Sequence, residues 1–135
     1  MLGVREPDVY GFKNLSAIAL ECEELASELG LVIDFRQTNS EGEMVTIIQQ
    51  AREGFSGMII NAAAYSHTSI AIHDALKLLD IPVIEVHLSN IYKREDFRHT
   101  SYVAPLASGV ICGFGGHGYL LALEAMRALL DDDDA

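Results

Sequence analysis

Apolar residues recur at helical spacing along much of the chain. The first stripe consists of Ile18, Cys22, Leu25 and Leu29. Spacings of four, three and four place these side chains on one face, which predicts an amphipathic helix. Gly30 follows the stripe and favours a helix end there, because glycine readily adopts the left-handed conformation that closes helices.

Two further stripes follow residues that can cap a helix. The second consists of Met44, Ile47, Ile48 and Ala51, and the third of Ala71, Ile72, Ala75, Leu76 and Leu79. Ser40 and Glu43 form the S-x-x-E pattern of a capping box before the second stripe. Thr68 or Ser69 can cap the third. A last helix is predicted for residues 118–130.

Short apolar runs alternate with these helices. We predict strands at residues 31–35, 58–60, 83–86 and 109–112. The run at residues 58–60 is wholly apolar, as expected of a strand covered on both faces. The alternation predicts an α/β fold with a doubly wound parallel sheet and right-handed crossovers, in one domain that spans residues 1–135.

The segments without a period are predicted to be loops. Residues 1–13 contain Gly3, Pro7 and Gly11 and form an opening loop. Residues 87–105 form a long polar connection, and long loops inside compact domains are often functional.

Composition narrows the class of protein. Apolar residues make up 50% of the chain, and its formal net charge is −11. This acidity argues against nucleic acid or an anionic membrane as a partner. Residues 131–135 are expected to be a frayed acidic tail. Cys22 and Cys112 lack a C-x-x-C spacing, and no membrane span or signal peptide is recognisable, so we expect a cytoplasmic protein with reduced thiols.

Polar residues follow two of the predicted strands. Residues 61–69 (NAAAYSHTS) and 87–90 (HLSN) each begin with a hydrogen-bonding side chain directly after an apolar run. Asn61 could simply fix a turn, and Ser69 could simply cap a helix. Ligands of open α/β sheets, however, bind beyond the carboxyl ends of the strands, so two such loops at one edge favour a site.

Residues 113–118 (GFGGHG) have the G-x-G-x-x-G spacing of a dinucleotide fingerprint. Too little chain follows them to supply a second strand with a ribose-binding acid. We therefore predict that these glycines pack the last helix closely on a strand. The histidines have no H-E-x-x-H spacing and do not cluster with the cysteines, so no metal site is predicted.

Arg5 and Tyr10 share the opening loop. Taken alone, they are most simply a surface arginine and a half-buried tyrosine. A tyrosine is a poor base at neutral pH because its reference pKa is about 10. A nearby guanidinium favours the phenolate, which makes the pair a candidate base and activator.

Five ordered motifs resemble those of the type II 3-dehydroquinate dehydratases. Residues 3–11 (GVREPDVYG) resemble the family's G-x-R-E-P-x-x-Y-G, and residues 37–43 (QTNSEGE) its Q-x-N-x-E-G-E. Residues 61–75 are similar to N-x-x-A-x-x-H-T-S-x-A-x-x-D-A. Residues 81–90 (IPVIEVHLSN) and 94–102 follow family segments almost letter for letter.

The resemblance implies an anti elimination of water from 3-dehydroquinate to give 3-dehydroshikimate through an enolate, without a metal, Schiff base or organic cofactor. Tyr10 would remove a C2 proton, Arg5 would keep Tyr10 ionised, and His87 would protonate the departing hydroxyl. An anti loss needs an acid and a base on opposite sides of the substrate, and these residues come from different segments. The opening loop would be a lid that closes over the site.

The resemblance also implies the binding residues and the assembly. The matching substrate-binding positions are Asn61, His67, Leu88, Ser89 and Arg98. Asp74 matches a residue that reaches a neighbouring subunit's site in the family. The implied fold is flavodoxin-like, and the implied assembly is a homo-oligomer of trimers that build a dodecamer.

One departure from the family concerns its first strand and the N-G-P-N-L-N segment that precede the position of Gly3. The sequence starts at Met1-Leu2 and does not include them. A start codon assigned too late, an upstream segment outside these residues and a true truncation all remain open. We favour the first two, because losing a central strand would expose unpaired backbone. A true truncation would leave little activity.

Two rival functions remain open beside the dehydratase. The first is a non-catalytic oligomeric homologue that keeps the substrate pocket. The second is a flavodoxin-like nucleotide binder that uses residues 113–118.

Overall fold

The computed structural model describes residues 15–62, 69–89 and 103–134 of the chain. Arg5, Tyr10, His67 and Arg98 lie outside these ranges. In chain order, the elements are α3 (Leu15–Glu28), α4 (Glu41–Gln50), β1 (Met58–Ile60), α5 (Ile70–Lys77), β2 (Val83–His87), η4 (Ala104–Leu106), β3 (Gly109–Cys112) and α6 (His117–Asp134).

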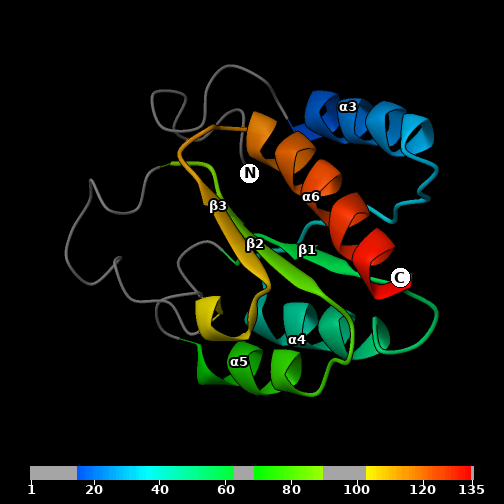
Figure 1. The fold of residues 1–135 in the computed structure, drawn as a ribbon. Coiled ribbons are helices and arrows are strands. Elements are labelled where there is room, and N and C mark those ends of the chain that lie inside the picture. Colours follow the sequence, from blue (N-terminus) through cyan, green and yellow to red (C-terminus); the bar gives the residue numbers. More distant parts are fainter. Residues whose placement is uncertain (1–14, 63–68, 90–102, 135) are drawn as a thin grey trace.

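The strands of the described ranges form a parallel sheet with the order β1-β2-β3. Helices α4 and α5 pack together on one face of this sheet, and α3 and α6 pack together on the other (Figure 1). Every residue of β2 is buried, because this central strand is covered on both faces. The predicted α/β class with a parallel sheet is therefore confirmed.

The hydrophobic core has parts on both faces of the sheet. Ile48 of α4 and Ile72 of α5 pack with Ile60 on one face. On the other face, Val86 of β2 packs with Ala122 and Met126 of α6. Apart from the exposed Ala71, the predicted helical stripes thus point inward, as burial of an amphipathic face requires.

The predicted helix caps are present, and the capping box at α4 differs in one hydrogen bond. Ser69 caps α5, since its Oγ accepts a hydrogen bond of 3.0 Å from Ile72 N–H. At α4, Ser40 Oγ accepts from Glu43 N–H, as predicted. In a capping box, the Glu43 carboxylate would accept directly from Ser40 N–H. Here Ser40 N–H donates to Thr38 Oγ1 instead, and Thr38 Oγ1 donates to the Glu43 carboxylate. Gly30 has a φ of 74° after α3, which confirms the predicted left-handed helix end.

The predicted strand at residues 31–35 is wrong. The segment shows the alternation of a strand, with residues 31, 33 and 35 partly buried and Val32 99% exposed. It joins no β-ladder among the described residues. Alternating polarity decides which side chains face the core, whereas a strand also needs a neighbour that pairs with its backbone.

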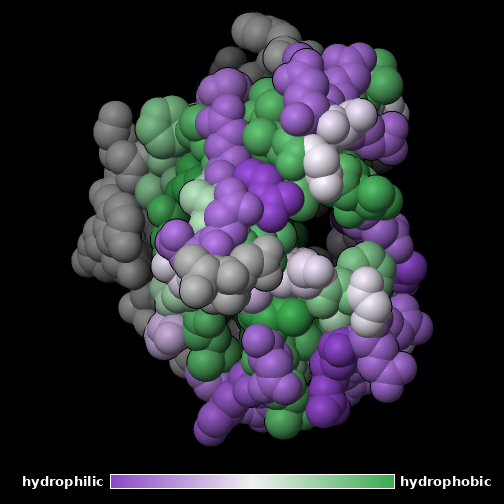
Figure 2. Space-filling model, turned by 45° about the vertical axis from the view of Figure 1, so that its right-hand side comes forward, coloured by the Kyte–Doolittle hydropathy of each residue, from purple (hydrophilic) through white to green (hydrophobic). Residues whose placement is uncertain are grey.

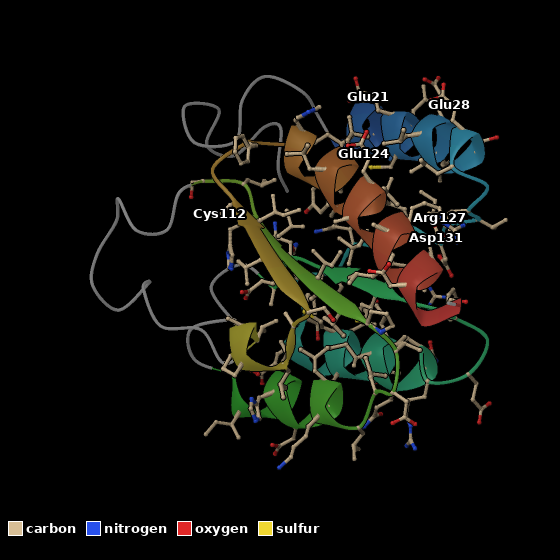
Figure 3. All side chains as sticks on the ribbon, viewed as in Figure 1. Glu21, Glu28, Cys112, Glu124, Arg127 and Asp131 are labelled. Atoms are coloured by element: carbon tan, nitrogen blue, oxygen red, sulfur yellow. The ribbon has the colours of Figure 1, made fainter. Side chains whose placement is uncertain are left out.

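The expected frayed tail is also wrong for most of its length. Helix α6 continues through the acidic run as far as Asp134. Arg127 Nη2 lies 2.8 Å from Asp131 Oδ1, one turn further along, and this pair links the run to the preceding turn (Figure 3).

The surface carries both hydrophobic and hydrophilic side chains. Figure 2 shows hydrophobic residues interspersed with hydrophilic ones across one face. The large apolar side chains exposed in the described ranges are Leu20, Val32, Phe55, Ile70, Leu78, Val110 and Phe114. No helix in these ranges is long and apolar enough to cross a membrane.

Candidate active site

The carboxyl ends of the strands bring several predicted site residues to one edge of the sheet. Asn61 follows β1, His87 ends β2, and Leu88 and Ser89 follow it. Ile60 is in register with Glu85, so Asn61 continues the chain beside the last residues of β2. This is the edge at which parallel α/β sheets bind ligands.

His87 is held in a buried and polar setting. Its side chain is 5% exposed, and its Nε2 lies 3.1 Å from Oε2 of Glu85, which is 1% exposed. The two residues are two positions apart on one strand, so their side chains leave the same face. A carboxylate beside an imidazole can fix the ring's orientation, which suits a histidine that transfers a proton.

Glu85 was not predicted as a functional residue, although the sequence carries a signal for it. It is the acidic residue within VIEVH, a strand that is otherwise apolar up to its histidine. A carboxylate is rarely buried without a partner. An acid two residues before a candidate histidine on a buried strand therefore indicates a functional pair.

The glycine-rich segment at residues 113–118 lies against the end of β2. Gly113 N–H donates to the carbonyl of His87 at 3.2 Å, and Gly115 N–H donates to that of Leu88 at 2.8 Å. Gly113 and Gly115 have φ values of 95° and 57°, where glycine avoids backbone strain. These bonds hold the backbone at His87 and Leu88 in place.

The same segment packs α6 closely on the rest of the fold. A Cβ at Gly118 would lie 3.2 Å from Val86 Cγ1 of β2. A Cβ at Gly116 would lie 2.7 Å from Ile18 Cδ1 of α3. The predicted role of these glycines in close helix packing is thus seen in the structure.

The side chain of Asn61 is held by a hydrogen bond to a residue of α6. Its Nδ2 donates a hydrogen bond of 3.1 Å to Tyr119 Oη, across 58 positions of sequence. Spacing along the chain carried no signal for this contact, because it depends on how α6 crosses the sheet.

Asp74 does not join the residues at the sheet edge. It lies on α5 and is exposed, whereas Ile72, Ala75 and Leu76 of that helix face the core. No group of three His, Cys, Asp or Glu side chains in the described ranges is arranged to hold a metal ion. Cys22 and Cys112 are free thiols. Cys112 ends β3 (Figure 3), where it is in register with His87 of β2.

Comparison with known proteins identifies the family. A family described as Dehydroquinase class II matches residues 1–127. The chain belongs to the class II dehydroquinase family. Membership agrees with the predicted resemblance, and the matched range includes every predicted site residue.

Named relatives of this dehydroquinase cover nearly the whole chain. It is 58% identical to the 3-dehydroquinate dehydratase of Mesorhizobium japonicum over 130 residues, which are 96% of this chain and 90% of that protein. It is 56% identical to 3-dehydroquinate dehydratase 2 of Pseudomonas aeruginosa over 124 residues, or 92% and 84% of the two chains.

Solved structures agree with the fold of this dehydroquinase. The type II dehydroquinase from Propionibacterium acnes superposes with a TM-score of 0.90 at 46% identity, over 94% of this chain and 88% of that one. A 3-dehydroquinate dehydratase-like protein from Bifidobacterium longum gives 0.72 at 36% identity, over 87% and 89%. The fold is thus that of the type II dehydroquinases, as the flavodoxin-like prediction required.

Proposed function

We propose that this chain is a 3-dehydroquinate dehydratase, a hydro-lyase that converts 3-dehydroquinate to 3-dehydroshikimate. The observation that carries the proposal is membership of the dehydroquinase family across residues 1–127. The site adds support, because buried His87 lies beside Glu85 at the edge where such a sheet binds ligands.

The mechanism that we propose is an anti elimination through an enolate. Tyr10, as a tyrosinate, removes the C2 proton, and the guanidinium of Arg5 stabilises the phenolate. His87 protonates the departing hydroxyl from the other side of the substrate. Support for the acid role comes from the placement of His87 at the end of β2, with Glu85 Oε2 3.1 Å from its Nε2.

The substrate would be held by residues from several loops. We assign binding to Asn61, His67, Leu88, Ser89 and Arg98, with Arg98 offering its guanidinium fork to the substrate carboxylate. Asn61, Leu88 and Ser89 follow β1 and β2 at one edge, which supports a shared ligand for these three. Residues 1–13 would close over the site as a lid, and Arg94 would be a further contact to the substrate carboxylate or to this lid.

We propose that Asp74 acts in a neighbouring subunit of a homo-oligomer, with trimers that build a dodecamer. Asp74 lies between Ile70 and Leu78 at helical spacings of four, and these apolar side chains are 62% and 56% exposed. Apolar residues on both sides of an exposed acid fit a surface that is buried on assembly. A cytoplasmic location is proposed with this assembly, in keeping with the free Cys22 and Cys112.

The decisive experiment is a turnover assay that follows the absorbance of the conjugated product after addition of 3-dehydroquinate. We expect turnover in the unmodified protein. Tyr10→Phe is expected to abolish turnover while calorimetry still detects substrate binding. Substrate binding without turnover in the unmodified protein would favour the non-catalytic homologue, and nucleotide binding in its place would favour the flavodoxin-like alternative.

A further inference from the structure

The side chain of Tyr119 is fixed by packing on several sides. It lies in the first turns of α6 and packs against two parts of the core, one around Val86 and one around Ile18. The ring of Phe35 meets it edge-on, with centroids 6.1 Å apart and an interplanar angle of 66°. A side chain packed in this way presents its hydroxyl at a defined point.

That hydroxyl meets the side chain of Asn61. Asn61 Nδ2 donates to Tyr119 Oη at 3.1 Å, in a partly buried position at the carboxyl end of β1. The carboxamide is planar, with its nitrogen and oxygen on opposite sides of Cγ. Fixing the nitrogen on Tyr119 therefore also fixes the direction in which Oδ1 points.

The backbone around Tyr119 is tied to the same edge of the sheet. Tyr119 N–H donates to the carbonyl of Gly116, within the glycine-rich segment whose Gly113 and Gly115 donate to the carbonyls of His87 and Leu88. A single segment, residues 113–119, is thus bonded to the ends of both β1 and β2. It sets Asn61 relative to His87 through two separate sets of hydrogen bonds.

From these contacts we infer that Tyr119 is a positioning residue for substrate binding, which acts by orienting the carboxamide of Asn61. The inference rests on the proposed function, in which Asn61 contacts 3-dehydroquinate. Since Asn61 holds the substrate in the ground state and in the transition state alike, loss of its orientation raises KM and leaves kcat nearly unchanged.

Tyr119→Phe tests the inference, because it removes the hydroxyl and keeps the ring that packs against Phe35. Loss of one neutral hydrogen bond predicts a fall in kcat/KM of about five-fold, mainly through KM. Thr46→Val is the matched control, since it removes a hydroxyl that donates to Gly42 carbonyl, also at 3.1 Å, on the exposed side of α4. This control is expected to keep both constants.

A double-mutant cycle separates positioning from a structural role. If Tyr119 acts through Asn61, Tyr119→Phe has no further effect on kcat/KM in an Asn61→Ala background. Independent effects of the two substitutions would overturn the inference, as would a wild-type KM in Tyr119→Phe alone. If Asn61→Ala by itself keeps a normal KM, the proposed binding role of Asn61 fails, and the inference fails with it. Thermal melting of each variant identifies any loss of kcat/KM that comes from unfolding.

Discussion

Glu85 Oε2 lies 3.1 Å from His87 Nε2 within a fully buried strand. We predict that Glu85→Gln, which keeps the size of the side chain, lowers kcat by roughly ten-fold or more with a small change in KM, because the imidazole loses its carboxylate partner. Steady-state turnover of 3-dehydroquinate measures both constants. A control is Glu53→Gln, an exposed acid after α4. Unchanged kcat in Glu85→Gln would contradict a functional pair.

His87 itself is the proposed acid. His87→Asn is predicted to lower kcat by roughly 10²- to 10⁴-fold, the usual contribution of a general acid. The same variant is expected to retain proton exchange at C2 of the substrate in deuterated water, because Tyr10 is the proposed base for that step. Exchange lost together with turnover would argue that His87 is needed for both steps.

Asp74 lies on the outer face of α5, away from the sheet edge. If it serves a neighbouring subunit, Asp74→Ala and Tyr10→Phe are each nearly inactive alone but regain activity when unfolded together and reassembled. A mixed oligomer then contains sites with an intact Tyr10 and an intact Asp74 from different chains. Asp80→Asn, an exposed acid beyond α5, is the control and is expected to keep full activity. Absence of recovery in mixtures that do assemble would place Asp74 outside the neighbour's site.

The apolar residues beside Asp74 lead to a separate prediction about assembly. Leu78, the C-cap residue of α5, is 56% exposed, and Leu20 on α3 is 57% exposed. Leu78→Lys is expected to shift sedimentation towards smaller species, because a buried ammonium without a partner is costly in an interface. Leu20→Lys, matched in exposure, is expected to leave the assembly unchanged. Equal effects of the two substitutions would contradict an interface centred on α5.

Burial, with a smaller contribution from Glu21, raises the pKa of the Cys22 thiol from 9.0 to about 11. The folded state therefore holds this proton at pH values where the unfolded chain has lost it. The stabilisation is complete below about pH 9 and is lost as the pH rises towards 11, with a total of about 3 kcal/mol. Urea unfolding across this range should show a steeper decline for the wild type than for Cys22→Ala. An equal decline in unfolding free energy with pH for the two proteins would contradict the raised pKa of Cys22.

The sequence predicted most elements of the fold because local rules govern them. Apolar stripes mark α3, α4 and α5, and capping serines mark the starts of α4 and α5. The strand prediction for residues 31–35 was wrong because a strand forms only where a neighbouring strand pairs with its backbone. The position of Asn61, His87 and Leu88 at one edge of the sheet could be predicted, because each lies at or directly after the carboxyl end of a strand. Tyr119 could not, since its bond to Asn61 spans 58 positions and requires the three-dimensional arrangement of α6.

The hydrogen bonds from residues 113–119 to the ends of β1 and β2 also bear on how the protein is made. Ribosomes synthesise chains from the amino end, so a nascent chain stopped at Cys112 would contain Asn61, His87 and both predicted catalytic residues of the opening loop. It would lack Gly113 and Gly115, which donate to the carbonyls of His87 and Leu88, and Tyr119 of α6, which accepts from Asn61. We therefore expect the backbone at His87 and Leu88 and the side chain of Asn61 to reach these positions only after residues 113–119 have been synthesised and have packed on the sheet.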